Sequence, residues 1–234
     1  IHEKPEEAKL KGFNAFVAGL NLHLSLEDVN SKSMQEFLNK TKDLEVKDVI
    51  NRVLLRCMQK AKYSPACLGH FGLAATDYCH FTSPIRRYPD LSIHRIIKMW
   101  LHNELDSKTT AKLKSFVVDS SNKSSEREVL AEKAERDVDD YYKARYMQKH
   151  IGEKYVGMIS SVTKFGFFVE LDNTVEGLVH VSTLRDDHYV YDEPSRSLVG
   201  THNQKRFTMG QKIQVKCVNA SRFRKQVDFE IVWR

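Results

Sequence analysis

The segment from His80 to Asp90, HFTSPIRRYPD, brings together side chains that could bind a phosphate. Arg86 and Arg87 are adjacent, and a guanidinium can donate two parallel hydrogen bonds to a pair of phosphate oxygens. Ser83 is a favoured N-cap residue and Pro84 a favoured first helical residue, so a helix is predicted to begin here. A capped helix start offers free N–H groups and the positive end of the dipole. The segment therefore predicts a phosphate site, and the plainer alternative is a capped helix with two solvated arginines.

The elements that must position these side chains are mostly helical up to residue 152. Apolar residues recur at helical spacing in 10–20 and 46–57, and again in 91–101, where a helix is predicted to resume. Residues 63–81 instead have the glycines and proline of a loop. Pro89 should end or kink the first turn after the cap. Two further helices are predicted at 111–118 and 124–151, the second closed by Gly152.

From residue 153 onward the pattern is that of β-strands, with five strands in about 80 residues. This number fits a small OB-type barrel, and the polar segment 186–207 is predicted to be an insertion between its strands. The sequence thus predicts an α+β, multidomain chain. A mostly helical domain would span 1–152, and a five-stranded OB-fold β-barrel would span 153–234.

The composition permits a polyanionic partner without requiring one. The formal net charge is +6, from 37 Lys and Arg against 31 Asp and Glu. No apolar run approaches the roughly 20 residues that span a bilayer, no signal peptide is visible, and the first residue is Ile. We therefore expect no membrane partner, a cytoplasmic location, and a chain that either begins inside a longer gene product or has been trimmed. The four cysteines form no CxxC pair, although Cys67, His70 and Cys79 leave a zinc-dependent binding module as one hypothesis.

Strand alternation separates core aromatics from exposed ones in the predicted barrel. Phe168 alternates with apolar neighbours and shares its face with a glutamate, so it should point outward, as should His180. Phe165 has the wrong parity for that face, but a bulge at Gly166 could turn it outward. These three rings would form a stacking platform for single-stranded nucleic acid. The candidate phosphate contacts beside it are Lys164, Arg222 and Arg224.

Two independent motifs resemble one known family. The run GHFGLA at 69–74, the segment HFTSPIRRYPDL, and His94-Arg95 resemble the C-terminal half of the catalytic (RNB) domain of the RNase II/RNase R exoribonucleases. The opening residues His2 to Pro5 also look like that family. Residues from about 155 onward resemble the RNA-binding domain first described in ribosomal protein S-one. The resemblance therefore covers nearly the whole chain.

The resemblance implies a processive hydrolase that removes nucleoside monophosphates from the 3′ end of single-stranded RNA. The family holds Mg²⁺ with a cluster of aspartates in the N-terminal half of its catalytic domain, and that cluster does not appear in this sequence. A similar DxDD pattern occurs at Asp137, Asp139 and Asp140, but we interpret it as part of a solvated helix face. No metal ligand is therefore predicted in this chain, which should bind RNA without cutting it efficiently.

The resemblance also assigns roles to individual residues. Arg86 matches the family arginine that reaches the scissile phosphate, so it is the predicted catalytic residue. His94 is more simply a buried histidine with a satisfied hydrogen bond. The residues predicted to contact RNA, each with a structural role as the alternative, are Arg87, His80, Thr82, Ser83, Arg95, Glu135, Lys164, Phe165, Phe168, His180 and Arg222.

A second class of function stays open at this point. The chain could belong to a non-catalytic RNA-binding protein, associated with the ribosome, that kept the barrel and a degenerate nuclease half. The intact arginine segment argues against such decay, because a pure binding module has no use for an arginine aimed at a scissile phosphate. The expected partners are single-stranded RNA and, beyond it, the ribosome or RNA-decay factors. The expected oligomeric state is a monomer.

Overall fold

The computed structural model describes residues 1–20, 22–44, 46–193 and 195–233. The chain forms two compact units, each assembled from segments that are separate in sequence. The first unit contains Ile1–Leu10, Leu26–Asn39 and Leu55–Lys133, and the second contains Lys11–Ser25, Lys40–Leu54 and Ala134–Arg234. The domain boundary at residue 152 stays a prediction.

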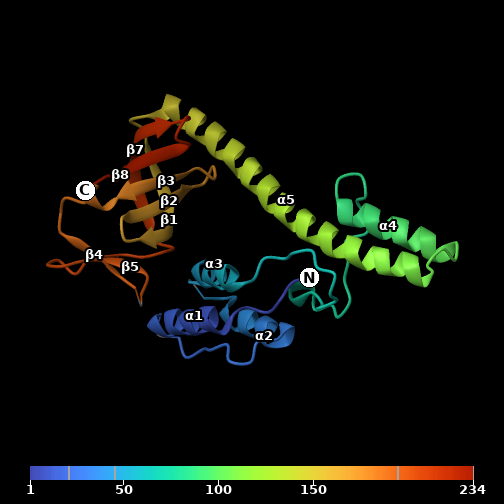
Figure 1. Cartoon of the computed structure of the whole chain (residues 1–234). Helices are drawn as coiled ribbons and strands as arrows, with labels where there is room; N and C mark the ends of the chain where they lie inside the picture. The colour runs from blue at the N-terminus through green and yellow to red at the C-terminus, as the bar shows by residue number, and fades with distance from the viewer. Residues whose placement is uncertain (21, 45, 194, 234) are drawn as a thin grey trace. The chain divides into compact units, whose positions relative to one another are not determined.

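The part of the chain before residue 152 is mainly helical, as the apolar spacing predicted. Phe13, Val17, Ile50 and Val53 belong to the predicted stripes and are fully buried. The helical elements, labelled in Figure 1 where there is room, are α1 (Glu7–Gly19), α2 (Ser31–Thr41), α3 (Lys47–Cys57), the 3-10 turn η1 (Phe71–Leu73), α4 (Tyr88–Leu101), α5 (Ser107–Met147) and the 3-10 turn η2 (Gln148–His150).

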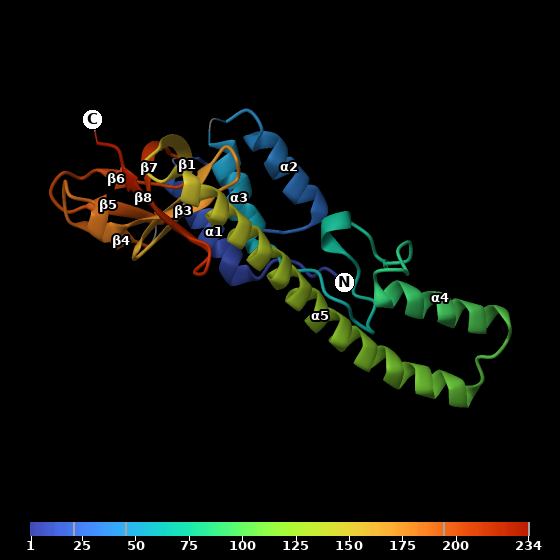
Figure 2. The ribbon, with the colours of Figure 1, turned by 90° about the horizontal axis from the view of Figure 1, so that it is seen from above.

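The two helices predicted at 111–118 and 124–151 are one helix, α5, so their separation was wrong. No glycine or proline occurs between Ser107 and Met147, and nothing in that stretch therefore interrupts the hydrogen-bond ladder. The helix ends before Gly152, which has a φ of +95° and follows the η2 turn. The two views in Figures 1 and 2 show the first part of α5 beside α4.

The helix predicted to begin at Ser83 begins at Tyr88 instead. Its N-cap residue is Arg87, which has extended backbone angles (φ −117°, ψ 115°). Pro89 thereby falls in the first turn, where its missing N–H costs no hydrogen bond. The Ser83 carbonyl closes a separate turn by accepting bonds from the N–H groups of Arg86 (3.2 Å) and Arg87 (3.0 Å). These two N–H groups are consequently not free to bind an anion.

The predicted five-stranded barrel is confirmed. Its strands close in the order β1-β2-β3-β8-β7, and the insertion predicted at 186–207 forms a separate three-stranded sheet, β4-β5-β6. The strands are β1 (Lys154–Thr163), β2 (Gly166–Leu171), β3 (Glu176–His180), β4 (Tyr189–Asp192), β5 (Ser197–Gly200), β6 (Arg206–Phe207), β7 (Lys212–Ser221) and β8 (Gln226–Ile231), with the 3-10 turn η3 (Val181–Thr183) after β3.

Side-chain alternation along β2 and β3 follows the prediction. Phe167 and Val169 are fully buried in the barrel core, whereas Phe168 between them is only partly buried and His180 is exposed. Gly166 begins β2 with a φ of +150°, and a Cβ there would lie 2.2 Å from the Val179 carbonyl oxygen. Only glycine therefore fits where β2 leaves the turn.

Asp187 joins two loops of the insertion between β3 and β7. Asp187 accepts hydrogen bonds from the backbone N–H groups of His188 (2.7 Å), His202 (2.8 Å) and Asn203 (2.7 Å). These bonds, that of Asn203 foremost, lower the pKa of Asp187 against the opposing effect of burial. No helix in the described part of the chain has the length and apolar content needed to cross a membrane.

Candidate nucleic-acid interface

The segment that carries Arg86 is fixed by side chains of α4. His94 Nε2 lies 2.8 Å from the carbonyl oxygen of Phe81, and the two rings stack with centroids 4.3 Å apart. Asp90 Oδ1 accepts a 2.8 Å hydrogen bond from the backbone N–H of Ser83. His94 is thus partly buried with its hydrogen bond satisfied, close to the role predicted for it.

Arg87 turns inward and pairs with the same aspartate. Its Nη2 donates to Asp90 Oδ1 at 2.9 Å, and the side chains are 17% and 0% exposed. Burial alone would raise the pKa of Asp90, but the N–H of Ser83 and the Arg87 guanidinium outweigh it and lower that pKa. The Arg87–Asp90 pair therefore holds the turn, which is the structural role that the sequence left open for Arg87.

Arg86 points the other way, into solvent. The side chains of Arg86 and Thr82 are exposed, and neither forms a hydrogen bond or ion pair with any residue that the structure describes. Between them Ile85 is 97% exposed. Side chains of α4 hold the turn in place. The hydrogen-bond donors of the Arg86 guanidinium are therefore available to a ligand.

His80 precedes this turn and is bound from the other side. Its Nδ1 lies 3.0 Å from the hydroxyl of Tyr63, with the ring planes nearly perpendicular. Burial, followed by the charge of Arg87, lowers the pKa of His80. A neutral imidazole is therefore favoured at neutral pH, which suits a hydrogen bond with Tyr63 better than a direct contact with phosphate.

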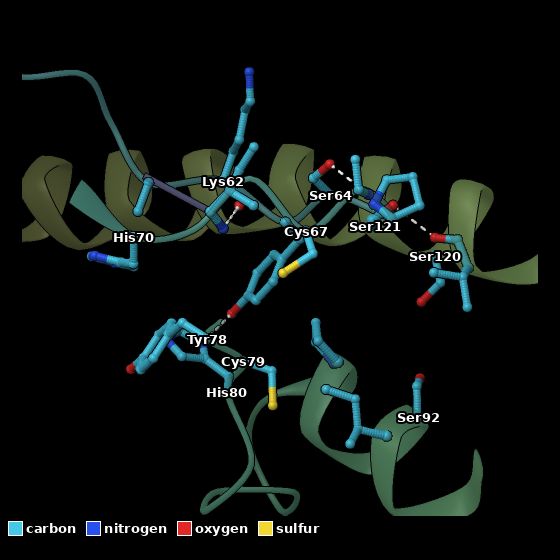
Figure 3. A pocket seen from close by; sticks show the side chains of 18 of the residues that line it. Lys62, Ser64, Cys67, His70, Tyr78, Cys79, His80, Ser92, Ser120 and Ser121 are labelled. Atoms are coloured by element: carbon cyan, nitrogen blue, oxygen red, sulfur yellow. Dashed lines mark hydrogen bonds between the residues drawn. The ribbon is translucent and has the colours of Figure 1, made fainter. Parts of the chain in front are cut away.

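A cavity of about 410 Å³ lies beside His80 in the first unit (Figure 3). Figure 3 shows Tyr78, Cys79 and His80 on one side of it and Cys67 facing them. Its wall is largely apolar and comes from the 60–80 segment, α4 and α5. The apolar and aromatic residues that line it include Tyr63, Tyr78, Ile93, Ile96, Phe116 and Val117.

The three rings of the predicted platform lie together on the barrel. Gly166 pairs with His180 across β2 and β3, and the carbonyl oxygen of Phe165 accepts a 2.9 Å bond from the N–H of Val181. The rings of Phe165 and Phe168 meet edge to face with centroids 6.2 Å apart, and Phe165 is 49% exposed. We call Phe165, Phe168 and His180 the aromatic platform.

The route by which Phe165 reaches the platform differs from the prediction. Lys164 and Phe165 form the turn between β1 and β2, so the turn and not a bulge at Gly166 directs the ring outward. The register shift in β1 lies earlier, between Ile159 and Ser161. Lys164 is exposed next to the platform, as a phosphate contact would require.

Arg222, another predicted RNA contact, lies at a different end of the barrel from the platform. Arg222 is in the turn between β7 and β8, where its guanidinium sits 4.9 Å from the ring of Phe223. Because β8 runs parallel to β3, this turn precedes β8 at the end of the barrel opposite His180. Arg95 is exposed on α4 and Glu135 on α5.

The side chains do not form a metal site within the described ranges. No group of three or more His, Cys, Asp or Glu residues is placed to hold an ion there. Asp137 pairs with Lys225 at 2.9 Å, and the Cys67 thiol lies 3.3 Å from Asp77 Oδ1. The residues of the described chain therefore do not fit the carboxylate-rich coordination of Mg²⁺.

Sequence reasoning missed Asp90 and Tyr63, two of the residues that fix the arginine segment. Asp90 follows Arg87 by three residues, the spacing at which helical side chains pair, so this partner was readable from the sequence. Tyr63 is 17 positions from His80 in a loop, and no local pattern joins them.

Two family models match the chain. The model for the RNB domain matches residues 1–103, and the model for the S1 RNA binding domain, the S-one type named above, matches residues 148–231. The two matched regions contain the arginine segment and the aromatic platform respectively.

Similar proteins align with nearly all of this chain. Ribonuclease R 1 of Lactococcus lactis is 43% identical over 98% of this chain and 28% of its own length. Ribonuclease R of Aquifex aeolicus is 40% identical over 99% of this chain and 33% of its own. The structure of Mycoplasma genitalium RNase R with ribose methylated single-stranded RNA matches with a TM-score of 0.91 and 30% identity, covering 99% of this chain and 37% of that one.

The chain thus spans about a third of the length of the relatives it matches, and the alignments with them cover 98% and 99% of this chain. The chain belongs to the RNase II/RNase R family and carries part of the RNB domain followed by the S1 RNA binding domain.

Proposed function

We propose that this chain is part of a processive 3′→5′ exoribonuclease that hydrolyses single-stranded RNA to nucleoside monophosphates. The observation that carries the proposal is the difference in burial and pairing between the two adjacent arginines. Arg87 is committed to Asp90, whereas Arg86 is exposed on the fixed turn. At a plain solvated helix start, both arginine side chains would be exposed to solvent. The buried Arg87–Asp90 pair instead fixes the turn and supports a role for the exposed Arg86 in binding a ligand.

In this proposal Arg86 donates hydrogen bonds to oxygens of the scissile phosphate and stabilises the charge that grows there during hydrolysis. The aromatic platform holds upstream bases by stacking, which tolerates any base and so suits degradation without sequence preference. Thr82, Lys164 and Arg95 are exposed and available to the RNA backbone.

Mg²⁺ belongs to the proposal as a cofactor of the complete enzyme. It would stabilise the attacking and leaving oxygens, and its ligands would come from residues outside this chain. We accordingly propose that the isolated chain binds RNA and does not cut it efficiently. A cytoplasmic location, a monomeric state and contacts with the ribosome or RNA-decay factors are further parts of the proposal.

A chimera tests the catalytic part. This chain would replace the matching region of Ribonuclease R 1 from Lactococcus lactis, to which it is 43% identical. With 5′-labelled single-stranded RNA and Mg²⁺, we expect a ladder that shortens from the 3′ end, and Arg86→Ala should slow it by at least about 100-fold. Arg86→Lys is the matched control for charge without the guanidinium fork.

The isolated chain gives the second half of the test. We expect it to retard the same RNA on a native gel and to leave it intact in the presence of Mg²⁺. A chimera that binds RNA but never shortens it would favour the non-catalytic RNA-binding protein. Cleavage by the isolated chain would place metal ligands within these residues and overturn that part of the proposal.

A further inference from the structure

Helix α3 contacts the barrel within the second compact unit. Arg52 Nη1 donates a 2.8 Å hydrogen bond to Glu170 Oε2 on β2, and the two side chains are 40% and 34% exposed. Val49, three residues earlier on α3, touches the turn before β7, because a Cβ added to Gly210 would lie 2.1 Å from its Cγ2. Gly210 in turn donates its N–H to the carbonyl oxygen of Ile159 at 2.8 Å. This face of α3 is therefore fixed against β1 and β2.

Glu170 lies on the outer face of β2, next to the aromatic platform. Strand alternation puts Glu170 and Phe168 on the same face, whereas the residues that alternate with them are buried in the core. Positions two residues apart on one face of a strand are separated by about 7 Å. The ion pair therefore holds the Arg52 guanidinium beside the platform, near the end of β2 that lies away from Lys164.

The carboxylates on this face would oppose RNA if they were left alone. Glu170 lies directly across from Glu176 on β3 in the antiparallel register, and like charges in that position repel each other. The same two charges would repel the phosphates of a strand bound at the platform. Arg52 neutralises Glu170, and the hydroxyl of Ser160 donates a hydrogen bond to Glu176. The cation from α3 thus makes this end of the platform compatible with a polyanion.

Arg52 also keeps hydrogen-bond donors for a ligand. A guanidinium carries five N–H donors, and among the residues that the structure describes only Nη1 of Arg52 makes a hydrogen bond. The carboxylate of Glu170 fixes one edge of the guanidinium, which leaves a second edge for a pair of phosphate oxygens. Because the side chain is 40% exposed, a phosphate can reach that edge from solvent.

We propose that Arg52 binds a backbone phosphate of the RNA whose base stacks on Phe168, and that Glu170 is the positioning residue that orients its guanidinium. This role rests on the proposed function, because it extends the aromatic platform onto a helix outside the barrel. Arg52 lies in the region that matches the RNB domain, whereas Glu170 lies in the region that matches the S1 domain. One stretch of RNA is then bound by both regions at once.

Anisotropy titrations of a fluorescent single-stranded RNA with the whole chain, at several salt concentrations, test both roles. We expect Arg52→Gln to weaken binding by about fivefold or more at low salt and to flatten the slope of log affinity against log salt by about 0.7. Glu170→Gln removes a negative charge, so a purely electrostatic role would tighten binding. We expect it to weaken binding by about threefold instead, because the guanidinium loses its fixed orientation. Arg52→Lys should keep the salt slope but lose affinity, since it retains the charge without the fork.

Lys216→Gln is the matched control, since Lys216 is exposed on β7, a strand that borders neither β2 nor β3. It should leave both the affinity and the salt slope unchanged. Because the Arg52–Glu170 pair is partly exposed, its loss should change the melting temperature of the chain little, and thermal unfolding of each variant checks that it is folded.

Two results would overturn the proposed role of Arg52 and Glu170. One is an unchanged affinity and slope in Arg52→Gln, and the other is unchanged or tighter binding in Glu170→Gln. Phe168→Ala, measured beside them, separates this role from the proposed function. Weaker binding in Phe168→Ala without any change in Arg52→Gln would refute the role of Arg52 alone, whereas an unsubstituted chain that does not bind RNA would refute both.

Discussion

Arg87 Nη2 donates a 2.9 Å hydrogen bond to Asp90 Oδ1, an atom that also accepts the backbone N–H of Ser83. One buried carboxylate oxygen thereby joins the turn to the first turn of α4. Its second oxygen, Oδ2, and Arg87 Nε have no hydrogen-bond partner among the residues in the described ranges. The pair is consequently sensitive to the loss of either member, since the remaining charge would be buried without its ion-pair partner.

The two arginines should differ sharply in what their removal costs. Arg87→Ala leaves Asp90 buried without its cation, so we expect the free energy of unfolding to fall by about 3 kcal/mol. Arg86→Ala removes an exposed side chain and should change it by less than about 0.5 kcal/mol. Urea unfolding of the two variants checks this. Equal losses would mean that Arg86 also has a structural partner, against the geometry of the turn.

The lowered pKa of Asp90 predicts how this pair responds to acid. A carboxylate with a folded pKa below its unfolded value of about 3.9 stabilises the fold above that value and ceases to do so as pH falls through the folded pKa. Asp90→Asn removes the titration but keeps an acceptor for the N–H of Ser83. The stability difference between the two chains should be constant from about pH 7 to 5 and shrink below about pH 4.

Urea unfolding at each pH measures the difference in the free energy of unfolding between the two chains. The contributions of the other acidic groups cancel, because both chains share them. A difference that grew as pH fell would show that the folded pKa of Asp90 is raised. Burial would then outweigh the two hydrogen bonds, contrary to the arrangement described.

Local patterns predicted some elements well and others poorly, for physical reasons. The barrel and the outward side chains Phe168 and His180 followed from strand alternation, which is set within a few residues. The start of α4 was not predicted correctly, because Ser83 has the residue type of an N-cap. In the structure the N–H of Ser83 donates to Asp90 instead, and the helix begins at Tyr88. The inward turn of Arg87 depends on the same tertiary contact.

Gly166 should be the position in the barrel that least tolerates a side chain. A Cβ there would meet the Val179 carbonyl oxygen at 2.2 Å, and the φ of +150° is strained for any other residue. We expect Gly166→Ala to lower the free energy of unfolding by more than about 2 kcal/mol. Gly152→Ala is the control, because that φ of +95° is also strained but nothing lies within 4 Å of the added carbon. Chemical unfolding would contradict the steric argument if both variants lost the same amount.

The aromatic platform predicts a separation between affinity and salt dependence. Phe165→Ala and Phe168→Ala each remove a stacking surface worth about 1–3 kcal/mol per base and no charge. Binding of single-stranded RNA should weaken by about 5-fold or more in each variant, while the slope of log affinity against log salt stays unchanged. Lys164→Ala should instead flatten that slope by about 0.7 if the lysine contacts one phosphate.

Fluorescence anisotropy titrations at several salt concentrations measure both quantities on the same samples. Phe167→Leu is a useful control, because that ring is fully buried in the barrel core and its change should alter stability before it alters RNA binding. A changed slope with unchanged low-salt affinity in Phe165→Ala would show that Phe165 does not stack on bases. The grip on RNA would then have to come from charged residues alone, and the proposed role of the barrel in holding upstream bases would fail with it.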